Sequence, residues 1–328
     1  MVVLKNASMT VSQKSPLLDP ALLERIKGLS LVARRVVEGV LHGLHRSPFH
    51  GLSIEFAQHR QYTPGDELKR LDWRVLARSD RYVIKQYEQE TNMRVVLLVD
   101  CSRSMAFDGK KLSAFSRQPS AGESDPDGKF HYARVMAAAL AYLLLSQGDS
   151  VGLLLMNYRI IEQLGPRAAP GHILSLCQLL ESTTPSGPTD LAAVIALLAA
   201  RMTRRSLVIV ISDLLDQPEN VLAGLGQLTH RGHEVLVLQV LDPRELEFDL
   251  GVAGRGVTVI RDMETGAEFE AEPLLVRDLV RAEIARFCDQ LDAGARAHGV
   301  HLQRCPTDVP VERALTQCLV SRMKGRRV

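Results

Sequence analysis

The sequence predicts an α/β protein with a doubly wound, mostly parallel sheet. From about residue 93 onward, strand patterns alternate with helical patterns, as βαβ units do. Several strand patterns are continuous runs of Val, Ile and Leu, which is typical of parallel strands covered by helices on both faces. The preceding residues show neither feature, so we expect a small N-terminal helix and a β-rich module before the sheet.

The N-terminal third divides into two segments. Between Pro20 and Gly43, apolar residues recur at three- and four-residue spacing, which predicts an amphipathic helix that ends at the glycine. The next segment contains Pro64-Gly65, the central pair of a type II turn, and a strand-like stretch from Tyr82 to Tyr87. The predicted units are a helical segment at 1–50, a β-rich module at 51–92 and the α/β domain at 93–322.

Within the α/β domain the elements follow in order. The predicted strands are 94–100, 151–156, 207–212, 234–240 and 299–304. The predicted helices are 130–147, 170–181, 189–204, 219–231, 274–297 and 309–322. Two segments interrupt the alternation: a polar loop at 107–129, expected to overhang the carboxyl ends of the strands, and short β-hairpins at 246–270 with a turn near Glu264-Thr265-Gly266.

Composition narrows the class of function. A net charge of +2 gives no reason to expect nucleic-acid binding. The five cysteines are odd in number and never form a C-x-x-C pair, which fits a reducing compartment. The longest apolar run, Leu191 to Ala200, is about half of what a membrane-spanning helix needs. With no apolar core of a signal peptide at the start, we expect a soluble, cytoplasmic protein without a membrane span.

The strongest functional signal follows the first strand of the sheet. Asp100, Ser102 and Ser104 alternate at its carboxyl end and would share one side of an extended chain. Ligands of doubly wound sheets bind at such ends, beside the topological switch point. One carboxylate with two hydroxyls suits Mg²⁺, with Mn²⁺ or Ca²⁺ as alternatives.

Two later residues complete this candidate metal site. Thr189 stands at the start of a helical run, and Asp213 ends a second apolar strand. The alternative is purely structural, since Asp and Ser also satisfy backbone donors in turns and Thr189 is a plausible helix N-cap. Three separate segments place oxygen ligands where the predicted fold binds ligands, and this agreement favours the metal site.

Three further features have competing interpretations. Trp73 and Arg74 belong to residue types favoured at protein interfaces, although an Arg–Asp network between modules explains them as well. Cys101 lacks a neighbouring base and is expected to be a buried structural cysteine. The stretch from Gly122 to Lys129 departs from a phosphate loop in spacing, and Phe130 replaces the Ser or Thr, so nucleotide binding is rejected.

These residues resemble known families. Asp100-x-Ser102-x-Ser104, Thr189 and Asp213 match the metal-ion-dependent adhesion site of von Willebrand factor A domains, which are Rossmann-type folds. Tyr62-x-Pro64-Gly65-Asp66 with Asp72-Trp73, together with Gly148-Asp149 and Gly187-x-Thr189-Asp190, is similar to the bacterial domain of unknown function 58 family. Members of that family join a short N-terminal module to a von Willebrand A-like domain.

The resemblance implies roles for individual residues. Ser102, Ser104 and Thr189 would bind the metal directly, and Asp100 and Asp213 would act mainly through bound water. Arg103 stands where many A domains have glycine, which places a long cation beside the site where it could meet an acidic partner. The resemblance also implies a MoxR-type AAA+ ATPase as the protein partner.

The leading hypothesis is therefore a non-enzymatic adaptor whose Mg²⁺ accepts an acidic residue of a partner protein. It would work with the ATPase in the maturation or remodelling of another complex. A metal-dependent hydrolase or phosphatase using Asp100 and Asp213 is the enzymatic alternative, and it is weakened because such chemistry usually needs more carboxylate ligands or a general base. A structural scaffold with an empty site is the third.

Overall fold

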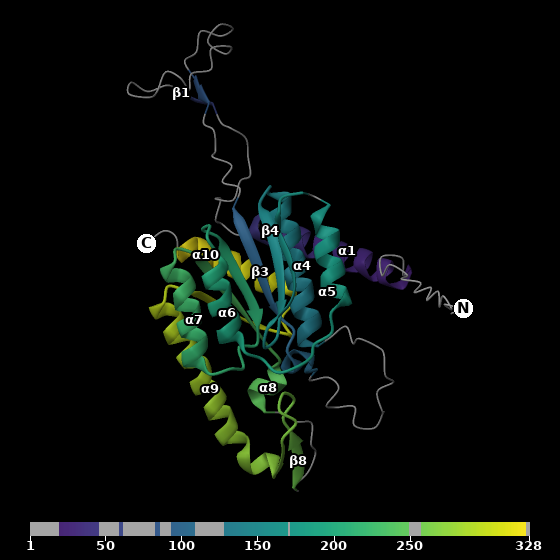
Figure 1. Ribbon diagram of the computed structural model, residues 1–328, viewed down its shortest axis with the longest axis vertical. Coiled ribbons are helices and arrows are strands. Elements are labelled where there is room, and N and C mark those ends of the chain that lie inside the picture. The colour runs from purple at the N-terminus through teal and green to yellow at the C-terminus, as the bar shows by residue number, and fades with distance from the viewer. Residues whose placement is uncertain are drawn as a thin grey trace, which may run out of the picture.

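The centre of the molecule is a six-stranded sheet in the order β10-β7-β6-β3-β4-β5, flanked by helices (Figure 1). The computed structural model describes residues 20–45, 59–61, 83–85, 93–108, 128–169, 171–248 and 257–325. The strands of the sheet are β3 (Arg94–Asp100), β4 (Ser150–Met156), β5 (Ile160–Arg167), β6 (Leu207–Ser212), β7 (Glu234–Leu241) and β10 (His301–Pro306). All neighbouring strands are parallel except β4 and β5. The predicted α/β class with a mostly parallel sheet is confirmed.

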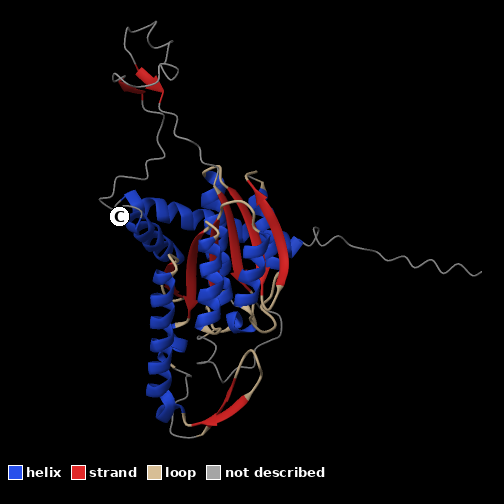
Figure 2. Cartoon of the chain, turned by 60° about the vertical axis from the view of Figure 1, so that its left-hand side comes forward, coloured by secondary structure: helices blue, strands red, loops and turns tan. Residues whose placement is uncertain are grey.

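Helices cover both faces of this sheet (Figure 2). The long helices are α1 (Pro20–His45), α4 (Lys129–Ser146), α5 (His172–Ser182), α6 (Leu191–Arg201), α7 (Pro218–His230), α9 (Pro273–Ala297) and α10 (Val311–Gly325). The buried residues of α1, α4, α5 and α10 form one hydrophobic cluster with the sheet, and those of α6, α7 and α9 form a second. The sheet is therefore doubly wound, in the manner of a Rossmann-like arrangement.

The central strand β3 shows why its sequence is apolar throughout. Val95, Leu97 and Val99 belong to the first cluster, whereas Val96 and Leu98 belong to the second. Successive side chains of a strand point to opposite faces, so a strand covered on both sides needs apolar residues at every position. Each buried Val or Leu contributes about 1.5 to 3 kcal/mol relative to exposure.

Helix α1 is part of the first cluster. Its buried residues fall on one stripe and pack with α4, α5 and α10: Leu29, Ala33, Val36, Val37 and Val40. The helix forms where the apolar spacing predicted it, but it continues past Gly43, the predicted end, to His45. Its buried stripe lies in the same core as the sheet. The boundaries of the three predicted units stay a prediction.

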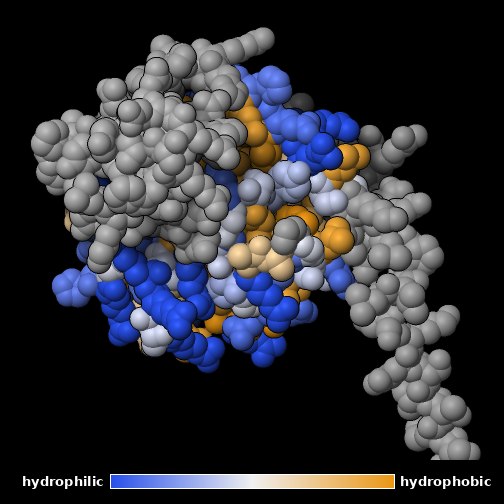
Figure 3. Space-filling view, turned by 90° about the horizontal axis from the view of Figure 1, so that it is seen from above, coloured by the Kyte–Doolittle hydropathy of each residue, from blue (hydrophilic) through white to orange (hydrophobic). Residues whose placement is uncertain are grey.

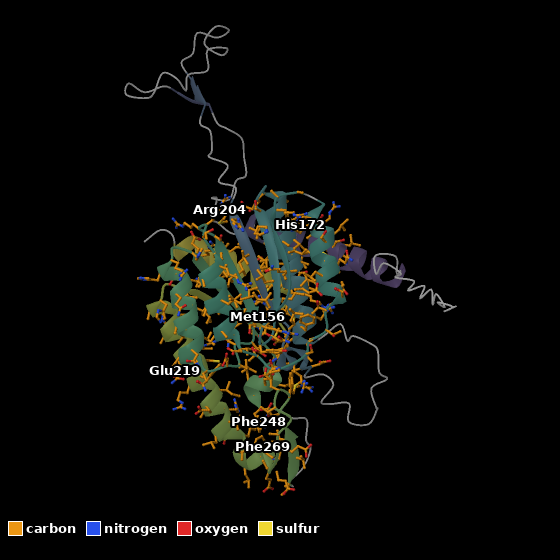
Figure 4. The ribbon with its side chains drawn as sticks, in the orientation of Figure 1. Met156, His172, Arg204, Glu219, Phe248 and Phe269 are labelled. Carbon is orange, nitrogen blue, oxygen red and sulfur yellow. The ribbon has the colours of Figure 1, made fainter. Side chains whose placement is uncertain are left out.

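The carboxyl ends of the parallel strands define where a ligand can bind. After β3 the chain forms β4 on one side of it and then returns to form β6 on the other side. The reversal makes the carboxyl ends of β3 and β6 the switch point of the sheet. Met156, labelled in Figure 4, marks the same end on β4, while His172 lies at the opposite end.

Smaller elements surround this core. The single-turn helices η3 (Arg103–Ala106) and α8 (Pro243–Glu247) follow β3 and β7, and the hairpin β8 (Thr258–Arg261) and β9 (Glu268–Ala271) precedes α9. Of the hairpins predicted at 246–270, the structure describes one, with its turn where it was predicted. Residues 246 and 247 belong to α8 instead, and β5 and α8 are additions to the predicted elements. Phe248 and Phe269 in Figure 4 show that α8 and the hairpin lie beyond the strand ends.

Parts of the predicted N-terminal module and of the polar loop lie outside the described residues. Of 51–92, the structure describes the antiparallel pair β1 (His59–Gln61) and β2 (Val83–Lys85). Trp73 and Arg74 lie outside the described residues, as does the stretch 109–127.

The described surface is largely hydrophilic where Figure 3 shows it, with hydrophobic residues exposed in between. Among the helices within the described ranges, none combines the length and the apolar character that crossing a bilayer requires. The five cysteines are buried and carry free thiols.

Candidate metal centre

The first part of the candidate site is the loop that leaves β3. Asp100 is buried, and its Oδ1 accepts a hydrogen bond from the Ser102 backbone N–H at 2.8 Å. The hydroxyl oxygens of Ser102 and Ser104 lie 3.0 Å apart and are both buried. The alternate spacing of Asp100, Ser102 and Ser104 predicts that they lie on one side of an extended chain. The chain does not stay extended, because the 3₁₀ turn η3 begins at Arg103. The turn nevertheless brings the two serine hydroxyls together.

The second part follows β6 and is tied to the first. The Ser212 hydroxyl donates to Asp100 Oδ2 at 2.6 Å and accepts the Leu214 N–H at 3.0 Å. Leu214 is buried with φ of +59°, a conformation that a leucine rarely adopts outside a constrained loop. Asp213 is fully buried between these residues, and its Oδ1 accepts the Leu215 N–H at 3.2 Å. Asp100 and Asp213 are thus both held at the switch point.

The third part is Thr189, just before α6. The N-cap of α6 is Asp190, whose side chain accepts the Ala193 N–H at 3.0 Å. The alternative role considered for Thr189, helix capping, is therefore taken by its neighbour. Thr189 Oγ1 is buried and has no hydrogen-bond partner. A buried hydroxyl without a partner is costly, which makes this oxygen a candidate ligand for something absent from the chain itself.

Backbone hydrogen bonds fasten the Thr189 loop to the serine loop. The Arg103 N–H donates to the Gly187 carbonyl at 2.8 Å, and the Ser186 N–H donates to the Cys101 carbonyl at 2.8 Å. Gly187 has φ of +75°, and a Cβ there would meet Asn157 Nδ2 at 3.0 Å. The glycine is therefore needed for both its backbone conformation and its close packing. Together these contacts set Ser102, Ser104 and Thr189 on adjoining loops.

Lys129 is a component that the sequence argument missed. Its side chain is fully buried at the start of α4, and Nζ lies 2.9 Å from Asp213 Oδ2 and 2.7 Å from Glu245 Oε1. Burial alone would lower the pKa of Lys129, but the charges of Asp213 and Glu245 outweigh it and raise the pKa above its ordinary value. The ammonium therefore stays charged beside one of the predicted metal-site carboxylates.

Glu245 had a local signal in the sequence. Asp242 and Glu245 form a capping box at the start of α8, directly after β7. A capping box at the carboxyl end of a parallel strand places a carboxylate at the same edge of the sheet as Asp213. No comparable signal marks Lys129, because a lysine in the first turn of an apolar helix is ordinarily exposed.

Glu264 is a second component that the sequence argument missed as a site residue, although it falls in the predicted turn of the β8–β9 hairpin. Its Oε2 accepts the Thr189 backbone N–H at 3.3 Å, and its Oε1 is buried without a hydrogen-bond partner. Burial is the largest cause that raises the pKa of Glu264. Hydrogen bonding to the Thr189 N–H opposes it, the nearby charge of Asp213 adds to it, and an interaction with the Ser104 side chain opposes it again. The hairpin thus delivers a carboxylate to the site.

The electrostatics of the site favour a positive charge. Burial is the first cause that raises the pKa of Asp100, to about 7, and the neighbouring charge of Asp213 is the second. Hydrogen bonds from Ser212 and Ser102 oppose the change without reversing it. A divalent cation beside Asp100 would stabilise the charged form of this buried carboxylate.

The residues fit a small, hard divalent cation. In the described part of the chain, no three His, Cys, Asp or Glu side chains come together as a metal-binding group. The predicted donor set is of a different kind, since hydroxyl oxygens outnumber carboxylates. Buried oxygens without partners on Thr189 and Glu264 supply ligand atoms of the type that Mg²⁺ prefers. Such a cation would screen the repulsion between the carboxylates.

Comparison with known proteins places the chain in a family. A family model described as a protein of unknown function, DUF58, matches residues 58–291. The chain belongs to the DUF58 family. Similar relatives include uncharacterised proteins of Mycobacterium bovis and Mycobacterium tuberculosis, each 30% identical over 313 residues, covering 94% of this chain and 92% of the relative.

Solved structures similar to this DUF58 chain share much less sequence. The conserved hypothetical protein BatB from Bacteroides thetaiotaomicron is 16% identical with a TM-score of 0.42, covering 71% of this chain and 99% of its own. An aerotolerance-related membrane protein from Bacteroides fragilis is 18% identical with a TM-score of 0.40, with the same coverage.

Two other residues of the DUF58 chain border the site. Arg103 is exposed between the buried Ser102 and Ser104, so its side chain is accessible at the mouth of the serine loop. Cys101 is fully buried, as expected, and burial raises the pKa of its thiol far above the ordinary value. A buried, protonated thiol is a poor nucleophile, so Cys101 serves packing.

Proposed function

We propose that this DUF58 protein is a non-enzymatic, metal-dependent adaptor. A divalent cation, Mg²⁺ above Mn²⁺ or Ca²⁺, would be held by Ser102, Ser104 and Thr189, with Asp100 and Asp213 acting through water. The cation would accept an acidic side chain of a partner protein. In this proposal the domain is von Willebrand A-like and the protein works in the cytoplasm with a MoxR-type AAA+ ATPase.

The observation that carries the proposal is the buried, unpartnered hydroxyl of Thr189. It lies on a loop that is hydrogen-bonded to the serine loop, at the carboxyl ends of parallel strands. A cation bound mainly by neutral hydroxyls keeps most of its charge and therefore attracts an external carboxylate. The exposed Arg103 beside it supports an acidic partner further.

A binding role accounts for Asp100 better than a catalytic one. Both of its carboxylate oxygens accept hydrogen bonds within the chain, from Ser102 N–H and from Ser212 Oγ. A carboxylate engaged in this way is suited to fixing the loops and holding a water, and is poorly placed to attack a substrate. The hydrolase alternative is ranked lower on this ground.

The ion pair of Lys129 favours a second candidate, a structural scaffold without metal. Its ammonium already balances the buried charge of Asp213 at 2.9 Å. In that case the site would serve only to hold the switch point of the sheet together, and partner binding would use other surfaces.

Metal titration separates the two candidates. Mn²⁺ binding, followed by electron paramagnetic resonance, is measured for the wild type, for the double variant Ser102→Ala/Ser104→Ala and for Ser175→Ala, an exposed serine on α5, as control. The adaptor proposal predicts that Mn²⁺ binds to the wild type and the control, that Mg²⁺ competes, and that the double variant loses binding. Wild-type protein that binds no Mn²⁺ would favour the scaffold.

Capture of the AAA+ ATPase from the native lysate tests the partner. The adaptor proposal predicts that it is retained with Mg²⁺ and lost with EDTA or in the Ser102→Ala/Ser104→Ala variant. If the ATPase were retained without metal and in the serine variant, its contact would lie elsewhere on the protein.

A further inference from the structure

The turn of the β8–β9 hairpin is shaped to present Glu264. Asp262 Oδ1 accepts the backbone N–H groups of Glu264 at 2.7 Å and Thr265 at 2.9 Å, and the Asp262 N–H donates to the Ala267 carbonyl at 2.8 Å. Gly266 takes φ of +74°, which a glycine adopts without strain. These bonds fix the backbone at the tip of the hairpin and leave the Glu264 side chain free to reach outward.

The Glu264 side chain reaches the metal centre from a distant part of the sequence. Its Oε2 accepts the N–H of Thr189, the residue whose own Oγ1 is buried and unpartnered. Oε1 of Glu264 is buried and unpartnered as well. These two oxygens belong to contacting residues and are candidate ligand atoms for one cation, because burying a carboxylate oxygen without a donor costs free energy.

Negative charge gathers on the hairpin side of Asp213. Lys129 Nζ is bonded to Asp213 and Glu245. The Glu264 carboxylate interacts electrostatically with Asp213 and adds negative charge on that side. A divalent cation between the hydroxyl loops and the hairpin would offset this charge.

The described side chains of β9 are largely exposed. Glu268, Phe269 and Glu270 of β9 are exposed, Phe269 at 58%. The β8–β9 pair lies beyond the strand ends of the sheet, next to α9 (Figures 1 and 2). The contact through Glu264 links the hairpin to the site. Elements with few buried apolar contacts open at low cost.

We propose that Glu264 is an in-chain acidic ligand of the metal centre, which closes the site from the β8–β9 hairpin. Its carboxylate takes the place that the acidic residue of a partner would occupy, so a partner must displace the hairpin in order to bind. This inference rests on the proposed function, because it requires a divalent cation at Ser102, Ser104 and Thr189.

The test combines metal affinity with hydrogen exchange of the hairpin. Mn²⁺ affinity and the exchange of amides in 257–271, with Mg²⁺ or EDTA, are measured for the wild type, Glu264→Gln and Glu268→Gln. Glutamine keeps the size of the side chain and removes its charge, and Glu268 is an exposed carboxylate on the same hairpin. We expect Glu264→Gln to weaken Mn²⁺ binding about tenfold or more, as loss of a supporting group at a metal site does.

Mg²⁺ should also slow exchange in the hairpin of the wild type and of Glu268→Gln, but not of Glu264→Gln. Unchanged Mn²⁺ affinity and unchanged metal-dependent protection in Glu264→Gln would overturn the in-chain ligand. If Ser102→Ala still weakened Mn²⁺ binding in that case, the proposed function would stand alone. A wild-type protein that bound no Mn²⁺ would overturn both.

Discussion

At the scale of single residues, Thr189 gives the sharpest test of the site. Its hydroxyl should destabilise the metal-free protein and stabilise the metal-bound one. We expect Thr189→Val to raise the free energy of unfolding in EDTA by about 1 kcal/mol, because valine keeps the shape and removes a buried hydroxyl without a partner. The stabilisation that Mg²⁺ gives the wild type should disappear in the variant. Urea unfolding with EDTA and with Mg²⁺ measures both effects.

Thr183→Val is the matched control for this prediction. Its hydroxyl donates to the Leu179 carbonyl at 2.8 Å, so its loss should cost about 0.5 to 1.5 kcal/mol in either condition. A Thr189→Val variant that was destabilised in EDTA in the same way would mean that the Thr189 hydroxyl has a partner in the metal-free protein.

Lys129 supplies the buried positive charge of the metal-free site. Lys129→Met should lower the free energy of unfolding in EDTA by about 3 kcal/mol or more, because it leaves the buried Asp213 and the partly buried Glu245 without their cation. Mg²⁺ should recover part of the loss. Arg205→Met serves as control, since Arg205 is 79% exposed and 3.9 Å from Glu234, and an exposed pair is worth less than about 1 kcal/mol. Equal losses in the two variants would mean that the Lys129 pair is not special.

At the scale of elements, the strands that were predicted are those buried on both faces. β3 and β6 are apolar at nearly every position because helices cover both sides, and such runs are visible in the sequence. β5 escaped prediction because it is an antiparallel edge strand, largely exposed, with Gly165 and Pro166 in its sequence. A proline removes a backbone donor and is tolerated at a sheet edge. In the sequence, however, a proline argues against a strand, so β5 was not predicted.

The site was predictable only where its residues follow strands or begin helices. Asp100, Asp213 and Thr189 sit at such boundaries, so fold logic alone brings them to one end of the sheet. Lys129 and Glu264 reach that end through tertiary packing of α4 and of the hairpin. The partners are 84 and 75 residues apart, and no strand end or turn pattern in the sequence indicates that these side chains meet.

The loop between α5 and α6 yields a prediction about how the site is held. Gly187→Ala should lower the free energy of unfolding by about 1 to 2 kcal/mol, because φ of +75° strains a residue with a Cβ. It should also weaken Mn²⁺ binding, since the Gly187 carbonyl anchors the Arg103 N–H of the serine loop. Denaturant unfolding and Mn²⁺ titration check the two effects.

Gly171→Ala controls for the loss of a glycine. Gly171 has φ of −67°, and a Cβ there would meet nothing within 4 Å, so the change should be neutral or slightly stabilising. Normal Mn²⁺ affinity in Gly187→Ala would show that the loop does not set the geometry of the ligands.

At the scale of the whole molecule, the candidate site joins segments that are far apart in the sequence. It gathers the ends of β3 and β6, the starts of α4 and α6, and the turn of the hairpin. A cation bound there would favour the native state over the unfolded chain, which cannot assemble these ligands. Metal binding is therefore coupled to the stability of the fold as a whole.

It is also testable whether helix α1, in the N-terminal part of the chain, belongs to the core of the α/β domain. Its buried stripe packs on α4, α5 and α10, with Val37 only 3% exposed, whereas Val32 on the opposite side is 39% exposed. If α1 belongs to the core of the domain, Val37→Asp should lower the free energy of unfolding by about 3 kcal/mol or more, because it buries an unpaired charge. Val32→Asp should change it by less than about 1 kcal/mol.

The pair of variants is matched in residue type and helix, so propensity effects cancel and packing alone separates them. Thermal unfolding should show one transition in all three proteins, moved to lower temperature only by Val37→Asp. A separate early transition in Val37→Asp, with the main one unmoved, would instead make α1 an independent unit that docks on a domain stable without it. Because α1 covers α4, whose first residue is Lys129, loss of its packing should also weaken Mn²⁺ binding.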